Sequence, residues 1–374
     1  MKNVLVTGAR GFIGKNLITA LQRREEGDAV SVTTFSSQDP IDKLSELVSN
    51  ADVVFHLAGA NRPEKDEDFQ TVNVDLTQSL VDCLEKSERS PVVVFTSSTQ
   101  ATRDNVYGKS KLAAEQVLTD YHQRTKNGTS IYRLPNVFGK WSRPNYNTVV
   151  ATFCHKLSHG EEISIHDPSS PMTLVYIDEV VRCLLRHVDA PDKLQLQEQV
   201  DETFDITVGE LADRLRAIDS VRKSLRIPDL SDSLNRYLYS TYNSLLDEDN
   251  FASPVDLKTD DRGWLFELVK SDTFGQIFVS TTKPGITRGN HYHDTKIEKF
   301  CLIQGTGIIR FRHLESEQVI EYPVDDSQIK IVDIPPGYTH SIENSGDQTM
   351  VVLFWANEIF NPERPDTYWV PVLQ

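Results

Sequence analysis

Short apolar segments alternate with polar, helix-like segments through the first half of the chain. The apolar segments are rich in Val, Leu and Phe, a composition that is typical of strands. The predicted strands are Lys2–Val6, Val30–Phe35, Val53–Leu57, Val92–Thr96 and Ile131–Arg133, and the predicted helices include Ile41–Val48, Leu76–Glu85 and Ser110–Tyr121. Strands that alternate with helices are typical of βαβ units. We therefore predict an α/β domain with a doubly wound parallel sheet, covered by helices on both faces.

The pattern changes at about Phe251, after which no helical period is found. Short strands broken by Gly, Pro, Asn and Asp follow, namely Gln276–Ser280, Lys299–Leu302, Gly307–Arg312, Lys330–Ile334 and Met350–Ala356. Such a succession is typical of an all-β antiparallel barrel or jelly roll. A run of polar residues at 247–250 marks the change. We therefore predict two domains, residues 1–246 and residues 247–374.

The composition is that of a globular protein in a reducing compartment. The chain has 374 residues, enough for two domains with separate cores, and is 39% hydrophobic and 25% charged. Its formal net charge of −16 argues against nucleic acid and membrane surfaces as partners. No secretory signal and no segment of roughly 20 apolar residues is present. The cysteines share no metal or disulfide spacing, so we predict a cytoplasmic location; they are Cys83, Cys154, Cys183 and Cys301.

A glycine-rich turn, Thr7–Gly14, follows the first predicted strand and opens a helix. Glycines at this position allow a tight turn and a close approach of the backbone to a pyrophosphate at the helix N-terminus. Taken alone, the motif would also fit a glycine-rich turn that binds no ligand. Its glycine spacing resembles that of the extended short-chain dehydrogenase/reductase family. The resemblance implies a Rossmann-type domain that binds a nicotinamide dinucleotide.

The end of the second strand distinguishes between the two nicotinamide cofactors. An NAD site places an acid there, to accept a hydrogen bond from the ribose 2′-hydroxyl. Here the strand ends in Phe35-Ser36-Ser37, without an acid, while Arg10 in the glycine turn is placed to meet a 2′-phosphate. We therefore predict NADPH. The predicted cofactor-binding residues are Gly8, Arg10, Gly11, Phe12, Ile13, Gly14, Leu57, Ala58, Gly59, Tyr107 and Lys111.

Tyr107 and Lys111 form a Tyr-x-x-x-Lys motif at the start of a predicted helix. Residues four apart share a helix face, and a nearby cation favours the phenolate form of a tyrosine. Tyr107 is therefore predicted to exchange a proton with a substrate near neutral pH. The hydroxyl residues at 96–99 end a predicted strand, and resemblance to the family's Ser-Ser-Ser segment implies Ser98, with Thr99 as the alternative. Ser98, Tyr107 and Lys111 are the predicted catalytic residues. Only eight residues separate Ser98 from Tyr107, fewer than in most relatives.

Histidine and glutamate residues of the second domain match the two cupin motifs. The first motif contains His291, His293 and Glu298, the second contains His340, and Ile329 stands where the second motif usually begins with glycine. His291 and His293 lie two apart on a strand and therefore point to one face, into the barrel. Three imidazoles and a carboxylate suit a divalent metal, so we predict one Zn²⁺ per cupin domain. The alternative is a metal-free cupin whose polar residues bind sugar or transfer protons directly.

The order of these motifs, together with specific segments along the whole chain, resembles the CapF family of bifunctional capsular polysaccharide synthesis enzymes. The segments include residues 61–64, 138–141, 260–263, 289–291 and 365–368. The resemblance implies that the cupin domain epimerises C3 of UDP-2-acetamido-2,6-dideoxy-4-hexulose. The first domain then reduces the C4 ketone with NADPH. The implied product is UDP-2-acetamido-2,6-dideoxy-L-talose, a precursor of UDP-N-acetyl-L-fucosamine.

The remaining predictions concern substrate contacts and assembly. Segment 133–139 resembles the reductase family's Arg-x-x-Asn-x-Phe/Tyr-Gly segment, which implies that Asn136 contacts the substrate. Arg143, Asn145 and Tyr146 follow it and are predicted to contact UDP, although an ordinary polar surface loop is equally compatible. Analogy of fold predicts a homodimer through the cupin domain. Two other functions stay open: a reductase with a structural, dimerising cupin, and a dehydratase or 4-epimerase that retains bound NAD.

Overall fold

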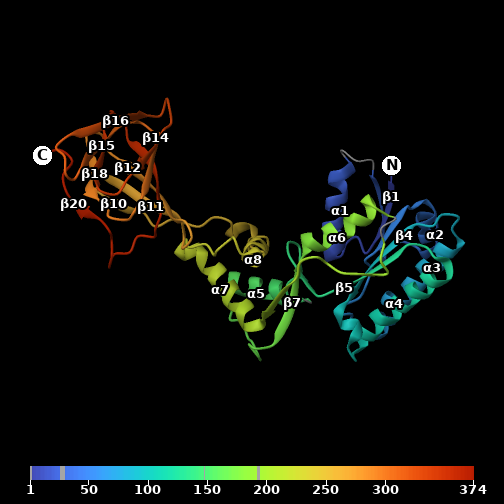
Figure 1. The fold of residues 1–374 in the computed structure, drawn as a ribbon. Helices are drawn as coiled ribbons and strands as arrows, with labels where there is room; N and C mark the ends of the chain where they lie inside the picture. Colours follow the sequence, from blue (N-terminus) through green and yellow to red (C-terminus); the bar gives the residue numbers. More distant parts are fainter. Residues whose placement is uncertain (1, 26–29, 147, 192–193) are drawn as a thin grey trace. The chain divides into compact units, whose positions relative to one another are not determined.

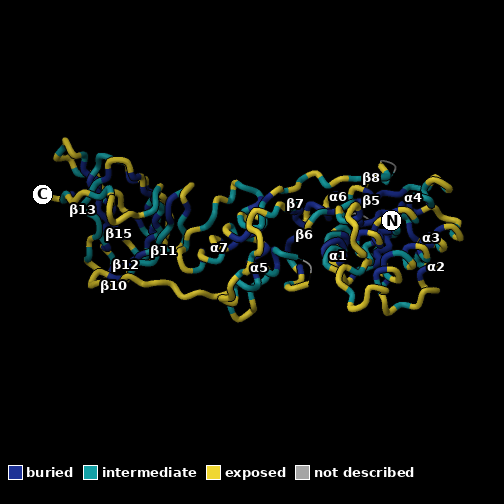
Figure 2. The backbone as a smooth tube through the Cα atoms, turned by 90° about the horizontal axis from the view of Figure 1, so that it is seen from below, coloured by how far each residue is buried: buried dark blue, intermediate teal, exposed yellow. Residues whose placement is uncertain are grey.

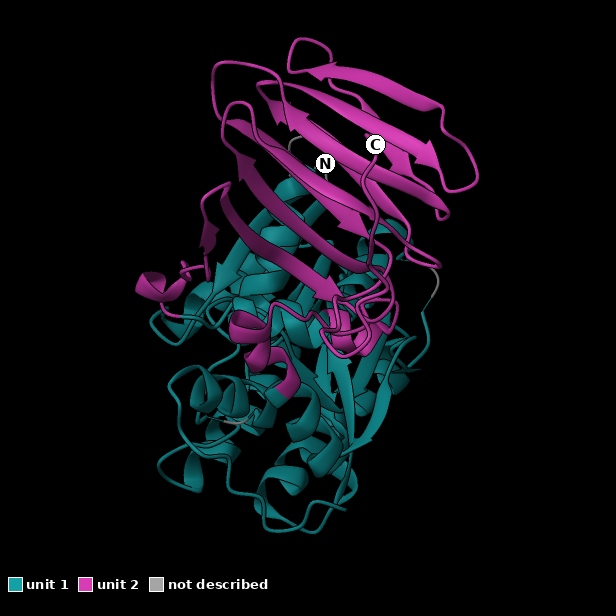
Figure 3. Ribbon diagram, turned by 90° about the vertical axis from the view of Figure 1, so that its left-hand side faces the viewer, with its two compact units in different colours: residues 1–216, 237–246 teal, residues 217–236, 247–374 magenta. Residues whose placement is uncertain are grey.

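The computed structural model of the protein describes residues 2–25, 30–146, 148–191 and 194–374. The chain divides into two compact units (Figure 3). The first comprises residues 1–216 and 237–246, and the second comprises residues 217–236 and 247–374. One of the changes from the first unit to the second falls between residues 246 and 247. Assignment of residues 217–236 to the second unit has no counterpart in the sequence pattern.

The first unit is built on a six-stranded sheet in the order β2-β1-β3-β4-β5-β8. Its neighbouring strands are all parallel. The strands are β1 (Lys2–Thr7), β2 (Val30–Phe35), β3 (Val53–His56), β4 (Val92–Ser98), β5 (Thr129–Leu134) and β8 (Gln197–Glu198). β3 and β4 are buried almost throughout, as expected of strands covered on both faces. The carboxyl ends of β1, β3 and β4 meet at one edge, which carries the glycine turn, segment 57–59 and Ser98.

Helices cover both faces of this sheet (Figure 1). α1 packs against α6 on one face, whereas α2, α3 and α4 lie side by side on the other. The helices are α1 (Phe12–Glu25), α2 (Ile41–Asn50), α3 (Leu76–Lys86), α4 (Val106–Thr125), α5 (Val149–Ser158), α6 (Ile177–Asp189), α7 (Val208–Ser224) and α8 (Ser233–Asn243), with the short helices η1 (Phe69–Asp75), η2 (Thr99–Thr102) and η3 (Glu248–Asn250). The core between α2–α4 and the sheet includes Leu44, Leu80, Phe95, Leu118 and Tyr121.

α4 begins four residues earlier than the predicted Ser110–Tyr121. Asn105 caps the helix, because its side-chain Oδ1 accepts a hydrogen bond from the N–H of Gly108 at 2.7 Å. Tyr107 therefore lies in the first turn of α4. A second, three-stranded sheet follows, made of β6 (Asn136–Phe138), β7 (Pro171–Tyr176) and β9 (Phe204–Thr207).

Two antiparallel sheets form the barrel of the second unit. Their strand orders are β10-β11-β12-β19-β14-β17 and β16-β15-β18-β13-β20. The strands are β10 (Lys258–Asp260), β11 (Gly263–Ser271), β12 (Gly275–Thr282), β13 (Thr287–Tyr292), β14 (Glu298–Gln304), β15 (Thr306–His313), β16 (Val319–Asp325), β17 (Ile331–Ile334), β18 (Tyr338–Asn344), β19 (Met350–Ala356) and β20 (Tyr368–Trp369). Buried and partly buried residues alternate along β19, so one face of the strand lines the core. That core includes Phe300, Ile309, Phe311, Ile342 and Phe354. Figure 2 shows buried segments, in dark blue, in both units.

A β-bulge interrupts β13 next to the predicted metal ligands. The pairing of β13 with β18 shifts between Gly289 and His291, so Asn290 is the additional residue. Gly289 and Asn290 have positive φ angles of 97° and 61°. A Cβ on Gly289 would lie 2.7 Å from the carbonyl oxygen of His340, so only glycine fits there. Because a bulge resets the alternation of side chains, Arg288 and His291 both face the barrel interior although they are three positions apart.

These observations confirm the fold class expected from the sequence. The first unit contains the parallel sheet with helices on both faces, and the second contains the all-β barrel. Within the described part of the chain, none of the helices has the length and apolar character needed to cross a bilayer.

Candidate active sites

The glycine turn between β1 and α1 packs directly on segment 57–59. Gly8 has a φ angle of 69°, and a Cβ there would lie 2.6 Å from the backbone nitrogen of Ala58. A Cβ on Gly14 would lie 2.3 Å from the carbonyl oxygen of Gly8. The first N–H groups of α1, beginning at Phe12, have no acceptor within the helix. Glycines without side chains and free N–H groups at the start of a helix together fit the pyrophosphate of a dinucleotide.

Arg10 reaches the loop that follows β2. Its Nη1 donates a hydrogen bond to Oε1 of Gln38 at 2.8 Å. The same loop contains Asp39, an acid that the strand-end pattern did not reveal. Its carboxylate accepts hydrogen bonds at 2.9 Å from both the N–H and the hydroxyl of Ser36, and forms a 2.6 Å ion pair with Lys43. Asp39 is therefore engaged within its own turn, whereas Arg10 remains exposed beside the expected ribose position.

Two buried polar residues, His56 and Asn73, hold this edge of the sheet together. His56 lies between the hydroxyls of Thr7 and Thr77, at 2.8 and 2.9 Å. Burial lowers the pKa of His56 to about 3, so its ring is neutral. Asn73 accepts a hydrogen bond from the N–H of Ala60 at 2.8 Å and donates one to its carbonyl oxygen at 3.1 Å. The sequence prediction missed Asn73, because a polar residue among the other polar residues of FQTVNVD gives no local signal of burial.

Ser98 and Tyr107 come together at the carboxyl edge of the sheet. Ser98 ends β4, and its hydroxyl oxygen accepts a hydrogen bond from the N–H of Gln100 at 3.2 Å. Burial raises the pKa of Tyr107, and a hydrogen bond with Ser98 partly opposes this effect. The direction is opposite to the lowering expected from the Tyr-x-x-x-Lys motif. Thr99, the alternative to Ser98, begins η2.

Lys111 is buried below Tyr107 on α4. Its Nζ donates a hydrogen bond to the carbonyl oxygen of Thr96 at 2.9 Å and lies 4.5 Å from the centre of the Phe95 ring. These contacts direct the ammonium group toward β4, which explains why Lys111 does not lower the pKa of Tyr107. Burial lowers the pKa of Lys111 itself to about 8, although the nearby Glu115 opposes this change.

Glu115, on α4, joins the neighbouring strands β4 and β5 through a hydrogen bond and an ion pair. Its carboxylate accepts a hydrogen bond from the hydroxyl of Ser97 at 2.5 Å. Two guanidinium nitrogens of Arg133 donate to the same carboxylate at 3.0 and 2.6 Å. This bridge connects β4, α4 and β5 directly behind Ser98. Sequence reasoning missed Glu115, because an acid on an amphipathic helix usually faces solvent.

The predicted substrate residues lie in and after β6. Asn136 is exposed, and its amide donates a hydrogen bond to the carbonyl oxygen of Thr173 at 3.0 Å. Farther along, the guanidinium of Arg143 lies 5.4 Å from the centre of the Tyr146 ring. The N–H of Asn145 donates to the hydroxyl of Thr152 at 3.0 Å. The structure thus pairs Arg143 with an aromatic face, an arrangement suited to a nucleotide, while the side chain of Asn136 is already hydrogen-bonded.

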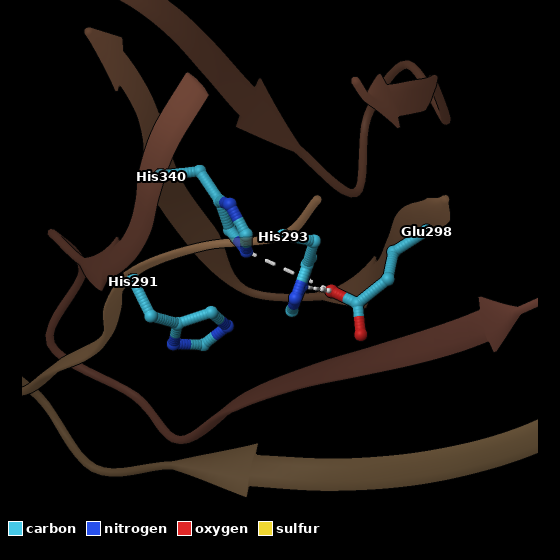
Figure 4. A group of neighbouring side chains, drawn as sticks. All are labelled: His291, His293, Glu298 and His340. Atoms are coloured by element: carbon cyan, nitrogen blue, oxygen red, sulfur yellow. Dashed lines mark ion pairs between the residues drawn. The ribbon is translucent and has the colours of Figure 1, made fainter. Parts of the chain in front are cut away.

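Three histidines and a glutamate converge inside the barrel (Figure 4). One ligand atom each from His291, His293, Glu298 and His340 lies within 4.8 Å of all the others. β13 and the residues after it supply two of these ligands, β14 supplies the glutamate, and β18 supplies His340. Burial, with the neighbouring His340 and His293, lowers the pKa of His291 to about 4. The ring of His291 is therefore neutral near pH 7, the form that binds metals.

Several features of this cluster fit a divalent metal. Nε2 of His293 and Nε2 of His340 are buried, and neither has a hydrogen-bond partner among the described residues. They lie 3.3 and 3.7 Å from the carboxylate of Glu298. Burial alone would raise the pKa of Glu298, but the two imidazoles outweigh burial and hold the pKa well below its usual range. Unpartnered buried nitrogens around an ionised carboxylate are the donor set expected of a zinc site.

Asp366 fixes the orientation of this ligand set from the far end of the sequence. Nδ1 of His293 donates a hydrogen bond to the backbone carbonyl oxygen of Asp366 at 2.6 Å, leaving Nε2 for a ligand. The Asp366 carboxylate accepts hydrogen bonds from the backbone N–H groups of Asp294, Thr295 and Lys296, at 2.8 to 2.9 Å. It thereby anchors the loop between the two ligands His293 and Glu298.

A chamber of about 230 Å³ adjoins the cluster and is lined by both His291 and Glu298. Its walls are mainly apolar, from Phe278, Phe300 and Phe354, but they also include Arg288 and Ser280. A larger cavity of about 470 Å³ lies between the end of α7 and residues 250–258. It contains neither histidines nor any predicted site residue. The smaller chamber is therefore the better candidate for chemistry.

A second acidic group, Glu179, Cys183 and Asp201, also has suitable spacing for a metal. Its carboxylates are already paired with arginines. Arg182 lies 2.6 Å from Glu179 and 3.0 Å from Asp201, and Arg186 forms a further ion pair with Asp201. Burial raises the pKa of the Cys183 thiol to about 11, which disfavours the thiolate. We therefore interpret this group as a structural ion-pair network.

Comparison with known proteins finds both domains together in a single family. Residues 4–201, more than half of the chain, match the NAD dependent epimerase/dehydratase family, and residues 258–368 match the Polysaccharide biosynthesis C-terminal domain. The crystal structure of the capsular polysaccharide assembling protein CapF from Staphylococcus aureus is 42% identical. The match covers 99% of this chain and 100% of that one, with a TM-score of 0.91. The chain belongs to the CapF family within the NAD dependent epimerase/dehydratase proteins.

Other relatives agree with membership in the CapF family. A UDP-2-acetamido-2,6-beta-L-arabino-hexul-4-ose reductase from Pseudomonas aeruginosa is 44% identical, over 98% of this chain and 97% of that protein. The spore coat polysaccharide biosynthesis protein SpsL from Bacillus subtilis is 26% identical over 30% of this chain and 82% of its own length. The resemblance inferred from the sequence is therefore confirmed. Family membership implies a nicotinamide cofactor, and the glycine turn fits one.

Proposed function

We propose that the protein is a bifunctional UDP-sugar enzyme of capsular polysaccharide synthesis. In this proposal, the first domain uses NADPH to reduce the C4 ketone of UDP-2-acetamido-2,6-dideoxy-4-hexulose. The hydrogen-bonded pair of Ser98 and Tyr107, at the same edge of the sheet as the glycine turn, is the observation that carries the proposal. The near full-length similarity to the Pseudomonas aeruginosa reductase supports the substrate class. Arg10, exposed beside the end of β2, supports the choice of NADPH over NADH.

The residues of the first domain supply the proton for the reduction. A bound NADPH supplies the hydride that C4 receives. Because burial raises its pKa, Tyr107 carries its proton at neutral pH and donates it to the ketone oxygen as that oxygen gains charge. Ser98 donates a hydrogen bond to the same oxygen. Lys111, with a pKa of about 8, is mainly protonated at pH 7 and stabilises the developing negative charge.

The second domain inverts C3 of the same substrate before the reduction. The proton on C3 is acidic only while C4 is a ketone, because its removal then gives an enolate. Reduction at C4 removes that acidity, so epimerisation comes first, and the final product is UDP-2-acetamido-2,6-dideoxy-L-talose. The four-residue cluster of His291, His293, Glu298 and His340 would hold Zn²⁺ through three imidazoles and a carboxylate. When bound, the ion supplies Lewis acidity at the ketone or maintains the shape of the site.

Sequence position alone makes four residues candidates for the C3 proton acceptor, and their surroundings differ: Tyr292, Lys296, Lys299 and Tyr338. Lys296 donates hydrogen bonds to the carbonyl oxygen of Pro365 and to Thr367, both at 3.0 Å. Lys299 forms an exposed ion pair with Asp333. The other two positional candidates, Tyr292 and Tyr338, are likewise absent from the residues that line the chamber. Glu298 and His291 do line it, and both also belong to the metal cluster.

Hydrogen exchange at C3 separates this function from a reductase with a structural, dimerising cupin. The keto sugar nucleotide is incubated with the protein in D₂O without NADPH, and the C3 signal is followed by NMR. NADPH is then added and its absorbance is followed. We expect deuterium at C3 before reduction, followed by NADPH oxidation. Reduction without exchange would support the structural cupin, and absence of both would contradict the proposed substrate.

A further inference from the structure

Two arginines line the chamber that contains His291 and Glu298. They are Arg288, on β13, and Arg262, just before β11. The side chain of Arg288 is 16% exposed and that of Arg262 is 53% exposed, so Arg288 lies deeper in the wall and Arg262 lies nearer the solvent. The bulge at Gly289 and Asn290 turns Arg288 toward the barrel interior. Neither arginine belongs to the reductase site or to the cluster of His291, His293, Glu298 and His340.

Both guanidinium groups are held in place and keep donors unused. Arg288 donates from Nε to the hydroxyl of Thr282 at 3.2 Å and from Nη2 to the carbonyl oxygen of Thr281 at 3.0 Å. Arg262 donates from Nε to the carboxylate of Asp260 at 3.0 Å. In the part of the chain that the structure describes, Nη1 of each arginine makes no hydrogen bond. Asp260 and the ionised Glu298 of the lining balance the formal charges of the two arginines (+2 − 2), in a chain whose net charge is −16.

Ser280 gives a second, independent indication of a ligand in this chamber. It lies on β12 and is 1% exposed, and its side chain belongs to the chamber lining. Its Oγ is buried and has no hydrogen-bond partner among the described residues. A buried hydroxyl without a partner is unfavourable, because it has lost its hydrogen bonds to water. A polar group of a ligand in the chamber would restore that hydrogen bond.

We propose that the cupin chamber is a substrate-binding site of its own, in which Arg262 and Arg288 bind the diphosphate of a nucleoside-diphosphate sugar. Ser280 hydrogen-bonds the sugar ring. At about 230 Å³ the chamber is smaller than the roughly 300–1,000 Å³ of pockets that enclose a whole drug-sized ligand, so it accommodates the sugar and leaves the diphosphate at the arginines. The inference rests on the proposed C3 epimerisation, whose substrate it locates.

UDP binding tests this site without any chemistry. We expect calorimetry to detect two UDP molecules per wild-type chain, one in each domain. Arg288→Gln and Arg262→Gln are each expected to weaken one of the two by about 10- to 150-fold, as for loss of a hydrogen bond to a charged group. The matched control is Arg226→Gln, because Arg226 is 56% exposed, belongs to the same unit and forms its ion pair with Asp272, away from the chamber lining. Wild-type affinity and stoichiometry in both chamber variants would overturn the inference.

The exchange reaction at C3 provides the second measurement. Arg288→Gln and Arg262→Gln are expected to raise KM for exchange by about 10- to 150-fold while kcat stays within a few-fold and the zinc content is unchanged. Ser280→Ala, which removes one oxygen atom, is expected to raise KM about fivefold. Unchanged KM in all three variants would overturn the inference while the proposed epimerisation stands. If the wild-type protein shows no exchange and the arginine variants still lose one UDP site, the epimerisation is refuted and the binding site is retained.

Discussion

Replacing Asp366 with asparagine tests whether the segment around residue 366 positions the metal ligands. One carboxylate oxygen of Asp366 accepts a hydrogen bond from the N–H of Asp294 at 2.9 Å. The other accepts from the N–H groups of Thr295 and Lys296 at 2.9 and 2.8 Å, and from the Thr295 hydroxyl at 3.1 Å. Asparagine would keep one acceptor oxygen but would turn an NH₂ group toward a backbone donor. The loop between His293 and Glu298 would lose part of its anchor.

The magnitude follows from these four hydrogen bonds. The most favourable orientation of the substituted amide keeps three of them and loses the one from Asp294. A hydrogen bond to a charged acceptor contributes about 1.5–3 kcal/mol and one to a neutral acceptor about 0.5–1.5 kcal/mol. Because the loop is partly exposed, we expect a net loss of about 2 kcal/mol. Contacts of this kind outside the ligand set typically change metal affinity by about 10- to 100-fold, so zinc binding should weaken by a similar factor.

The assay is a competition between the protein and a chelator for Zn²⁺, together with thermal unfolding of the metal-free protein. Asp325→Asn is the matched control. Asp325 also accepts backbone hydrogen bonds in a turn of the same barrel, from Ser327 and Gln328, but it has no contact with a ligand. The control should lose stability without losing zinc affinity beyond a few-fold. Equal zinc affinity in Asp366→Asn and wild type would refute the positioning role.

The pH dependence provides a further check on Asp366. Burial opposes its ionisation, but hydrogen bonds from Asp294, Thr295 and Lys296 hold its pKa well below the usual range. A carboxyl with a depressed folded pKa stabilises the protein above its unfolded pKa of about 3.9, and the effect is lost as pH falls through the folded value. The stability difference between wild type and Asp366→Asn should therefore be full at about pH 5–8 and shrink below about pH 4. A difference that persisted unchanged at about pH 2 would contradict this origin.

Three further predictions concern the reductase site. Tyr107→Phe should lower NADPH-dependent reduction by about 10²–10⁴-fold, because the proton donor is lost, while C3 exchange continues at the wild-type rate; equal losses in both reactions would argue against separate sites. The rate of reduction should fall as pH rises through about 8, the pKa of Lys111, because its positive charge is lost; a pH profile that stays flat well above that value would exclude that role. Arg10→Ala should raise KM for NADPH about 10-fold and leave KM for NADH unchanged, since only NADPH carries the 2′-phosphate; a parallel rise for both cofactors would contradict the NADPH assignment.

Strand alternation predicted that His291 and His293 face the same side, because they are two residues apart. Glu298 and His340 were predicted from the spacing of the cupin motifs, and the structure brings all four side chains together. The glycine turn was predictable for a similar reason, since the positive φ of Gly8 and the close contacts of Gly14 follow from local backbone geometry. Likewise, Tyr107 and Lys111 depend on four-residue spacing within a single helix. Local rules of this kind do not require knowledge of the tertiary fold.

The residues that the sequence did not reveal depend on contacts between distant segments. Asp366 meets His293 across 73 positions, and no local pattern links them. Glu115 becomes buried only because Arg133, on a neighbouring strand, neutralises its charge. The direction of the Tyr107 pKa shift was wrong for the same reason, since the orientation of Lys111 toward Thr96 is a tertiary contact. Burial and orientation of charged groups thus required the structure.

The bulge divides β13 into two segments, and side chains alternate between the two faces separately in each segment. Residues before Asn290 and residues after it obey alternation separately, and backbone N–H groups of Val370 and Val372 donate hydrogen bonds to Asn290 and fasten the junction. Deleting Asn290 would leave Arg288 and His291 two positions apart on a regular strand, still on one face, but it would remove both acceptors that hold Val370 and Val372. The additional residue therefore attaches the C-terminal segment to the strand that carries His291. Two hydrogen bonds at this one position thus join the last residues of the chain to this wall of the barrel.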